Sequence, residues 1–244
     1  MNTIAPSSPP ASDDSHARLD RLASIAEQLL DRCRQRGATQ AEVSCSEEHG
    51  LNVNVRMGEV ETVESTRDRG IAVTVFFGKR KGSASTADLR ESSLDATVDQ
   101  ACAIAKHTEE DPAAGLADAE LMARPEGGAF PGFDMWHPWE IEAERAVDLA
   151  LACENAGRES DRRIENSDGA SIGTGASLHV YANSHGFVGR ERSTQHTIGC
   201  ALIAGRGEGM QRDGWYTTAL ASDDLEAPAA VGRRAAARAA ARLQ

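Results

Sequence analysis

The stretch LNVNVRMGEVETVESTRDRGIAVTVFF, residues 51–77, decides the fold, because apolar and polar residues alternate through it with the period of a β-strand. Its first strand places Leu51, Val53 and Val55 on one face and polar residues on the other. Met57-Gly58-Glu59 is typical of a turn, and Asp68-Arg69-Gly70 of a second one. We therefore expect separate strands over 51–57, 60–66 and 71–77, paired antiparallel with their neighbours.

Helices are predicted on both sides of these strands. The first has an apolar stripe at helical spacing, a cap at Asp14 or Ser15, and Gly37 at its C-terminal end. Strand 41–48 follows it; after residue 77 come the basic turn GKRKG (78–82) and a short strand over 83–87. A second apolar stripe predicts a helix that ends before Pro112. The two stripes are Leu19, Leu22, Ala26, Leu29 and Cys33, and Leu94, Val98, Ala101 and Ala105.

The last third predicts a meander of long antiparallel strands. Residues 111–140 are loop-rich, and a third helix is expected from Ile141 to about Ala156. Turn signals at SDG (167–169), NSHG (183–186) and GRGEG (205–209) separate alternating stretches, and Ser222 or Asp223 caps a final helix. The fold class is α+β: a helix-flanked mixed or antiparallel sheet, then a long-stranded antiparallel meander and a C-terminal helix. We expect a disordered tail over 1–15, an N-terminal α+β domain over 16–125, and the helix and strand block over 126–244.

Composition limits the classes of partner. The chain has 244 residues, a net charge of −12 and 4% aromatic residues, so it repels nucleic acid and anionic membrane in bulk. It lacks an apolar run near the roughly 20 residues that a membrane span needs. The polar, Pro/Ser-rich start is unlike a signal peptide. Five cysteines without a CxxC pair indicate reduced, structural thiols in a cytoplasmic protein.

HExxH, GxxxxGK[ST] and paired zinc cysteines are missing from the sequence, and we expect no nucleophile elbow of the GxSxG type. His179, His185 and His196 allow a metal site to be drawn, but we favour strand and turn residues bonded to backbone or water. A triad of Ser184, His196 and Asp213 can also be drawn, and in a polar meander such combinations arise by chance. We predict no catalytic, cofactor-binding or metal-binding residue in this chain.

The remaining polar clusters have ordinary explanations. GKRKG is expected to be a charged hairpin turn and not a nucleic-acid contact. GRGEG follows a strand but opens no Ala/Gly-rich helix, so it predicts a flexible turn and not a phosphate loop. The acidic pairs Glu47-Glu48 and Glu109-Glu110 are expected to lie on solvated faces.

Long stretches of the chain resemble the TldD/PmbA metallopeptidase family. The resemblance covers residues 18–244 in order, and GKRKGSASTADL, YANSHGFVG and MQRDGWY are similar to its PmbA (TldE) branch, which lacks the zinc site. The stretches are VRMGEVETVESTRDRGIAVTVFFGKRKGSASTADL (55–89), AKHTEEDPAAGLADAELMA (105–123), RRIENSDGASIGTGASLHVYANSHGFVG (162–189) and GMQRDGWYTTALASDDLEAPAAVGRRAAARAAARL (209–243).

This resemblance implies the N-terminal part of a PmbA-type subunit in a cytoplasmic zinc metallopeptidase that acts on unfolded peptides. The family is also linked to peptide-antibiotic maturation, antitoxin turnover and modulation of DNA gyrase. The implied partners are a TldD-type subunit and unfolded peptide, with neither nucleic acid nor membrane. The implied zinc belongs to the partner subunit or to a C-terminal domain absent from this chain. In this role the chain would act as a scaffold for the complex and gate the substrate. Its sheet edges can hold an extended peptide by backbone hydrogen bonds.

Two alternatives stay open. The chain could be part of a peptidase that is active by itself, with zinc ligands beyond Gln244. It could also be a non-enzymatic modulator that binds gyrase or an antitoxin. The family places a further domain after the segment AVGRRAAARAAARLQ (230–244). We therefore expect Leu225, Val231, Ala235 and Leu243 to form an apolar stripe that packs on that domain.

Overall fold

The computed structural model describes residues 14–123 and 132–243, and these form an α+β architecture, as predicted. The predicted tail, residues 1–15, lies outside the described residues as far as residue 13. In the first half, α1 (Ser15–Gln35) precedes β1 (Gln40–Arg56), β2 (Glu59–Phe77) and β3 (Arg80–Thr86), and α2 (Glu91–His107) follows them. In the second half, α3 (Ala143–Ser160) precedes β4 (Ile164–Asn183), β5 (Val188–Ala204) and β6 (Gln211–Ala219), and α4 (Pro228–Ala241) follows them. Short 3-10 turns lie at Ala119–Leu121, Gly207–Gly209 and Ser222–Asp224.

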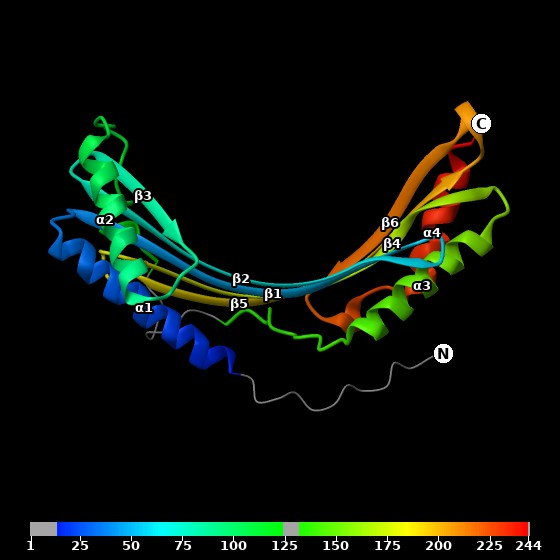
Figure 1. Ribbon diagram of the computed structural model, residues 1–244, viewed down its shortest axis with the longest axis horizontal. Helices are drawn as coiled ribbons and strands as arrows, with labels where there is room; N and C mark the ends of the chain where they lie inside the picture. Colours follow the sequence, from blue (N-terminus) through cyan, green and yellow to red (C-terminus); the bar gives the residue numbers. More distant parts are fainter. Residues whose placement is uncertain (1–13, 124–131, 244) are drawn as a thin grey trace.

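The two halves share one sheet. The strand order is β3-β2-β1-β4-β5-β6, every pairing is antiparallel, and β1 pairs with β4 at the centre. Each half has the element order helix, three strands, helix, so the sheet is built from two similar arrangements meeting at the β1–β4 pair. Figure 1 shows the result: a long bowed sheet with one pair of helices near each end.

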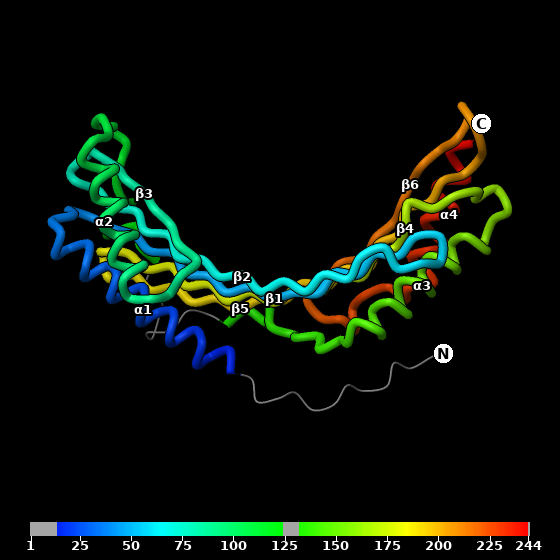
Figure 2. The backbone as a smooth tube through the Cα atoms, viewed as in Figure 1, coloured from blue at the N-terminus to red at the C-terminus, as the bar shows by residue number. Residues whose placement is uncertain are grey.

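The four α-helices of the described residues all pack on the same face of the sheet, which we call the helical face. At one end, α1 and α2 cover Val43, Cys45 and Val73. At the other, α3 and α4 cover Val53, Val55 and strands β4 and β5. The backbone trace shows the segment after residue 131 crossing beneath the middle of the bow, in the gap between α1 and α3 (Figure 2). We call residues 132–142 the strap.

The strands are longer than the sequence predicted. Asp68-Arg69-Gly70 is not a turn, because β2 runs through it and pairs Asp68 with Glu48 and Gly70 with Ser46. Strands 41–48 and 51–57 are likewise one strand, β1. SDG is not a turn either: β4 continues through it with an irregular register between Ser167 and Gly169 and a φ of 109° at Gly169, as in a β-bulge. The predicted turns at Met57-Gly58, NSHG and GRGEG are confirmed.

The helix ends also differ in detail from the prediction. Gly37 has a φ of 88°, as expected after α1, but the Asp14 side chain makes no capping hydrogen bond. The last helix starts at Pro228 and not at Ser222 or Asp223, which lie in a 3-10 turn. The prediction that its apolar stripe packs on a further domain is wrong, because the stripe is covered within this chain. Val231 and Ala235 are fully buried, and Leu225 and Leu243 pack on the same cluster with α3 and β5.

All five cysteines are buried and unpaired, in keeping with the structural role predicted for them. Among the described residues, no helix combines the length and the apolar character that crossing a membrane requires.

Candidate functional site

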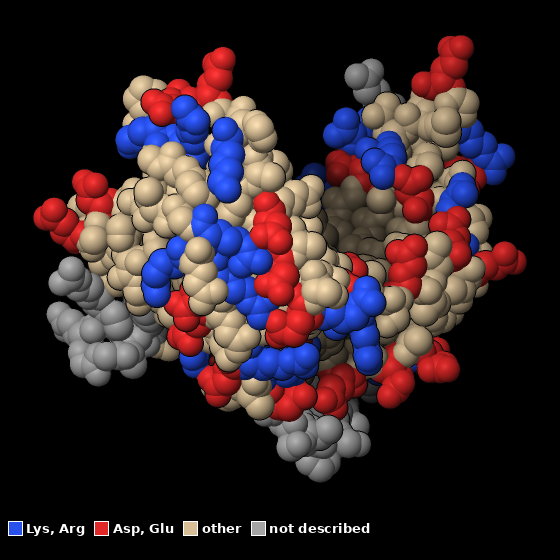
Figure 3. Space-filling view, turned by 60° about the vertical axis from the view of Figure 1, so that its left-hand side comes forward, with Lys and Arg blue, Asp and Glu red and all other residues tan. Residues whose placement is uncertain are grey.

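The face of the sheet opposite the helices is concave, and no described element covers it in Figure 1. Strand register places alternate residues on this open face. In the middle of β1, β4 and β5 most of them are small and neutral, while Glu48 of β1 and Glu64 and Asp68 of β2 add acidic groups beside them. The neutral set is Asn52, Asn54, Ser171, Gly173, Gly175, Ser177, Gln195, Thr197 and Gly199. Figure 3 shows a deep hollow between the two ends, with mainly uncharged residues at its base.

Hydrogen bonds between side chains fix this polar surface. Asn54 Nδ2 donates to Thr62 Oγ1 at 2.8 Å, and Tyr181 Oη donates to Glu42 Oε2 at 2.8 Å. Ser44 Oγ lies 2.8 Å from His179 Nε2. Such hydroxyl and amide groups can donate to and accept from a peptide backbone without reading its side chains. The open face therefore suits an extended polypeptide of varied sequence.

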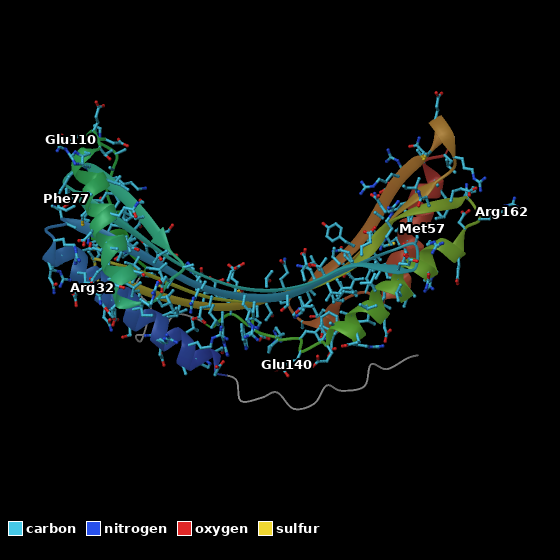
Figure 4. All side chains as sticks on the ribbon, in the orientation of Figure 1. Arg32, Met57, Phe77, Glu110, Glu140 and Arg162 are labelled. Atoms are coloured by element: carbon cyan, nitrogen blue, oxygen red, sulfur yellow. The ribbon has the colours of Figure 1, made fainter. Side chains whose placement is uncertain are left out.

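One end of the open face deepens into a hollow of about 500 Å³. Asn54, Thr62 and Ser171 line its floor, and Tyr216 of β6 stands at its side, 65% exposed. The Asp168 carboxylate pairs with Arg212 beside it. Figure 4 shows side chains from both ends of the bow pointing into the concave space. An exposed aromatic ring beside small polar groups is a common composition of peptide-contacting surfaces.

Sheet edges are available too, as the sequence suggested. β3 pairs only with Ile71–Phe77 of β2, so residues 59–70 of β2 have a neighbour on one side alone. The register of β1 and β2 shifts between Asn54 and Val55, which leaves Glu61 of β2 unpaired in a bulge. Bulges and charged side chains are devices that discourage edge-to-edge pairing. The open face is thus the better candidate for holding a peptide.

The three histidines considered as metal ligands do not come together. His179 lies on the open face, and His185 lies in the turn after β4. His196 is buried on the helical face, where Nδ1 lies 2.9 Å from Thr174 Oγ1 and Nε2 lies 2.9 Å from the His137 carbonyl. Loss of hydration lowers the pKa of His196, so the ring is neutral at pH 7. These bonds match the structural role that the sequence favoured.

The hypothetical triad is also dispersed. His196 is opposite Thr174 in β4, and Ser184 follows ten positions later, which corresponds to about 33 Å along a strand. Ser184 Oγ accepts from the Ala41 amide at 3.0 Å. Asp213 lies in β6 and pairs with Arg238 at 3.1 Å. Ser184, His196 and Asp213 therefore cannot act together.

The charged clusters mostly behave as expected. Only Gly78 and Lys79 of GKRKG form the turn between β2 and β3, because Arg80, Lys81 and Gly82 already belong to β3, which starts earlier than predicted. Lys79 Nζ donates to the Ala114 carbonyl at 3.0 Å. Glu110 pairs with Arg80 at 3.5 Å. Glu47 differs from the prediction of a solvated face, because its carboxylate is 17% exposed and pairs with Arg18 at 2.7 Å.

Within the described part of the chain, no group of three or more His, Cys, Asp or Glu side chains is placed to hold a metal ion. Both ring nitrogens of His196 and Nε2 of His179 already have partners, and all five cysteines are buried. The described residues therefore do not fit a zinc site, and we route no chemical step through one.

Two family models match the chain. Residues 41–105 match PmbA/TldA metallopeptidase domain 1, and residues 136–243 match the PmbA/TldA metallopeptidase central domain. The chain belongs to the PmbA/TldD family. It is 39% identical over 203 residues to metalloprotease PmbA of Escherichia coli O157:H7, covering 83% of this chain and 44% of that protein. It is 37% identical to the Haemophilus influenzae PmbA homologue, covering 85% of this chain and 45% of the relative.

Two solved structures share the fold. A proposed modulator of DNA gyrase from Bacteroides thetaiotaomicron superposes with a TM-score of 0.81 at 22% identity, covering 90% of this chain and 49% of that one. TldE from Thermococcus kodakarensis superposes with a TM-score of 0.69 at 15% identity, covering 88% of this chain and 47% of that one. The chain thus spans about half the length of its PmbA relatives. The activity of a whole PmbA protein is therefore only proposed for this chain.

Proposed function

We propose that this chain is the N-terminal part of a PmbA-type subunit in a two-subunit zinc metallopeptidase, where it holds unfolded peptide and scaffolds the complex. The observation that carries the proposal is the open, largely neutral face of the sheet, with a hollow of about 500 Å³ at one end. Neutral hydroxyl and amide groups bind a peptide backbone while discriminating little between side chains. The zinc would come from a TldD-type partner or from residues after Gln244, and the site of action would be the cytoplasm.

Peptide hydrolysis by the full-length subunit together with its TldD-type partner tests the role of the open face. Asn52→Arg places a long cation in the middle of this face, where Asn52 is exposed. We expect the KM for an unstructured peptide to rise about 5- to 10-fold with kcat nearly unchanged, because the loss is in binding. Ala103→Arg adds the same charge at an exposed position of α2 and serves as the matched control. Equal KM values for both variants would refute peptide binding at this face.

Zinc content, measured by elemental mass spectrometry, tests which subunit holds the metal. We expect zinc in the complex and none in the PmbA-type subunit purified alone. Zinc in that subunit alone would instead support the first alternative, a peptidase with its own ligands beyond Gln244. The second alternative, a non-enzymatic modulator, is favoured only by the gyrase-related descriptions of two structural neighbours. Recovery of gyrase or an antitoxin in a pull-down, without a TldD-type subunit, would support it. The charge of −12 disfavours direct contact with DNA in each case.

A further inference from the structure

The middle of the helical face holds a second cavity, away from the open face. Its volume is about 430 Å³, within the usual range of small-ligand sites. Residues of α1, of the sheet and of the strap line it. Figure 2 shows the strap crossing between α1 and α3. Strand register defines the floor: His49 is opposite Arg67, and Thr174 is opposite His196. Directly opposed side chains have Cβ atoms about 5 Å apart, so His49 and Arg67 are neighbours.

Three hydrogen-bond donors that line this cavity lack a partner among the described residues. The Trp136 indole N–H is buried without an acceptor. Among the described residues it is the one buried side-chain N or O atom without a hydrogen-bond partner. Neither an ion pair nor a hydrogen bond joins the Arg67 guanidinium or the His49 ring to another described side chain. A buried donor without an acceptor, such as the Trp136 N–H, costs free energy, and native proteins seldom keep one without a reason. His49 and Arg67 are exposed, so water satisfies their N–H groups, and the acceptor atoms of a ligand would replace that water.

The charges around the cavity indicate a single negative charge on that ligand. Arg18 is already neutralised, since its guanidinium lies 2.7 Å from Glu47 and 3.8 Å from Asp14. Arg67 is therefore the cation left for a ligand, while Glu140 at the rim and Asp14 add negative charge. A dianion such as phosphate would be repelled by these carboxylates, whereas one carboxylate needs one cation and a few neutral donors.

The walls indicate an apolar body on the same ligand. Trp136 and Trp139 of the strap, with Leu51 and Ile141, line the cavity. The strap is fixed there, because His137 N donates to Thr194 Oγ1 at 3.0 Å and Thr194 N donates to the Met135 carbonyl at 2.9 Å. The Trp139 ring meets the His196 ring edge-on with 5.5 Å between centroids. Rigid aromatic walls favour flat or branched apolar groups.

We propose that this cavity is a binding site for a carboxylate attached to an apolar or aromatic side chain, with Arg67, His49 and the Trp136 indole as its carboxylate donors. Loss of hydration, together with the positive charges of Arg18 and Arg67, lowers the pKa of His49, which leaves one ring N–H to donate at pH 7. Two molecules share this chemistry: a free acylated amino acid and the C-terminal residue of a peptide. The site is independent of the proposed peptidase role, because it lies on the other face of the sheet.

Quenching of tryptophan fluorescence in the 244-residue chain provides the test, since two of its three tryptophans line the cavity. The probes are N-acetyl-phenylalanine and its neutral amide, and the peptide AAAAF with a free or an amidated C-terminus. We expect each free acid to bind at least 10-fold more tightly than its amide. A peptide that binds more tightly than the acetylated amino acid identifies a peptide terminus as the source, and the reverse order identifies a small acid. Equal binding of acid and amide, tighter binding of inorganic phosphate, or no saturation would overturn the proposal.

Single substitutions test which residues bind the carboxylate. Arg67→Ala should raise the Kd about 10- to 100-fold, because a charge-assisted hydrogen bond is lost, and Arg67→Lys should restore part of the affinity. Trp136→Phe keeps the ring but removes the N–H, and it should raise the Kd a few-fold. Arg69→Ala is the matched control, because Arg69 lies two residues further along β2 and its Nε donates to the Ala87 carbonyl. Circular dichroism checks that each variant is folded. If Arg67→Ala and Arg69→Ala weaken binding equally, the site is wrong.

Discussion

At the scale of single residues, Glu154 is a carboxylate buried inside the protein. It is fully buried in α3, and its two carboxylate oxygens accept from the Met57 and Gly58 amides at 2.7 and 2.8 Å. These amides form the tip of the β1–β2 hairpin, where Met57 has a φ of 54° and Gly58 a φ of 83°. Glu154 therefore ties the hairpin to the helix that covers it.

Replacing Glu154 by alanine should lower the free energy of unfolding by about 2–4 kcal/mol, because two charge-assisted hydrogen bonds are lost together. Glu154→Gln should cost less, since it keeps one acceptor oxygen. Urea denaturation gives the free energies, and hydrogen exchange at Met57 and Gly58 reports the hairpin itself. Glu159→Ala is the control, because Glu159 is exposed on the same helix. A loss below about 0.5 kcal/mol for Glu154→Ala would show that the hairpin needs no anchor.

Sequence patterns predicted some residue roles and missed others for identifiable reasons. Gly37 was foreseen because a helix end needs a positive φ. Gly232 was not: a Cβ there would lie 1.9 Å from the Cys153 carbonyl of α3, a contact that depends on how two helices cross. Arg67 and His49 looked unremarkable, since their shared cavity arises from strand pairing and from a strap about 70 residues later.

At the scale of elements, β2 shows where period-based prediction fails. The alternation weakens over 59–70 because this half of the strand is exposed and its side chains need not be apolar. Gly70 then suggested a turn, but its backbone continues the ladder opposite Ser46. Helices were located more reliably, since each buries a regular apolar stripe on the sheet. Pairing of β1 with β4, which sets the whole architecture, leaves no local signal in either strand.

We expect the attachment of the strap to depend on pH. His196 joins it to the sheet through the His137 carbonyl, and burial lowers the pKa of His196 below its ordinary value of 6.5. The unfolded chain therefore takes up this proton first as pH falls, so the contribution to stability is present above about pH 6.5 and is lost on acidification. We expect the free energy of unfolding to fall between pH 7.5 and 5.5, and His196→Gln to reduce that slope.

The slope is measured by urea denaturation at several pH values. His49 also has a lowered pKa, so part of the pH dependence remains in the His196→Gln protein. His16→Gln removes an exposed histidine and should leave the slope as in the unmodified chain. An identical slope in the His196 variant would mean that this ring does not couple strap docking to protonation.

At the scale of the whole molecule, the sheet connects two hydrophobic clusters that none of the described helices joins. Leu29 belongs to the first cluster and Leu202 to the second, and both are fully buried. Strands β1 and β4 run through both clusters, paired from Glu42 with Asn183 to Val55 with Ala170. Because one ladder of backbone hydrogen bonds spans both ends, loss of packing at one end should be felt at the other.

We therefore expect one cooperative unfolding transition, although the sequence suggested units over 16–125 and 126–244. Leu29→Ala should cost about 2–5 kcal/mol, as buried leucine truncations do. It should lower the protection of amides in β5 and β6 against hydrogen exchange by nearly the same amount as those around Val43, and Leu202→Ala should act equally in the opposite direction. Leu121→Ala, at a side chain 74% exposed, is the control. If each variant loosens only its own end, the bowed sheet is a hinge between two folding units, and its curvature is then free to change when a peptide lies in the hollow.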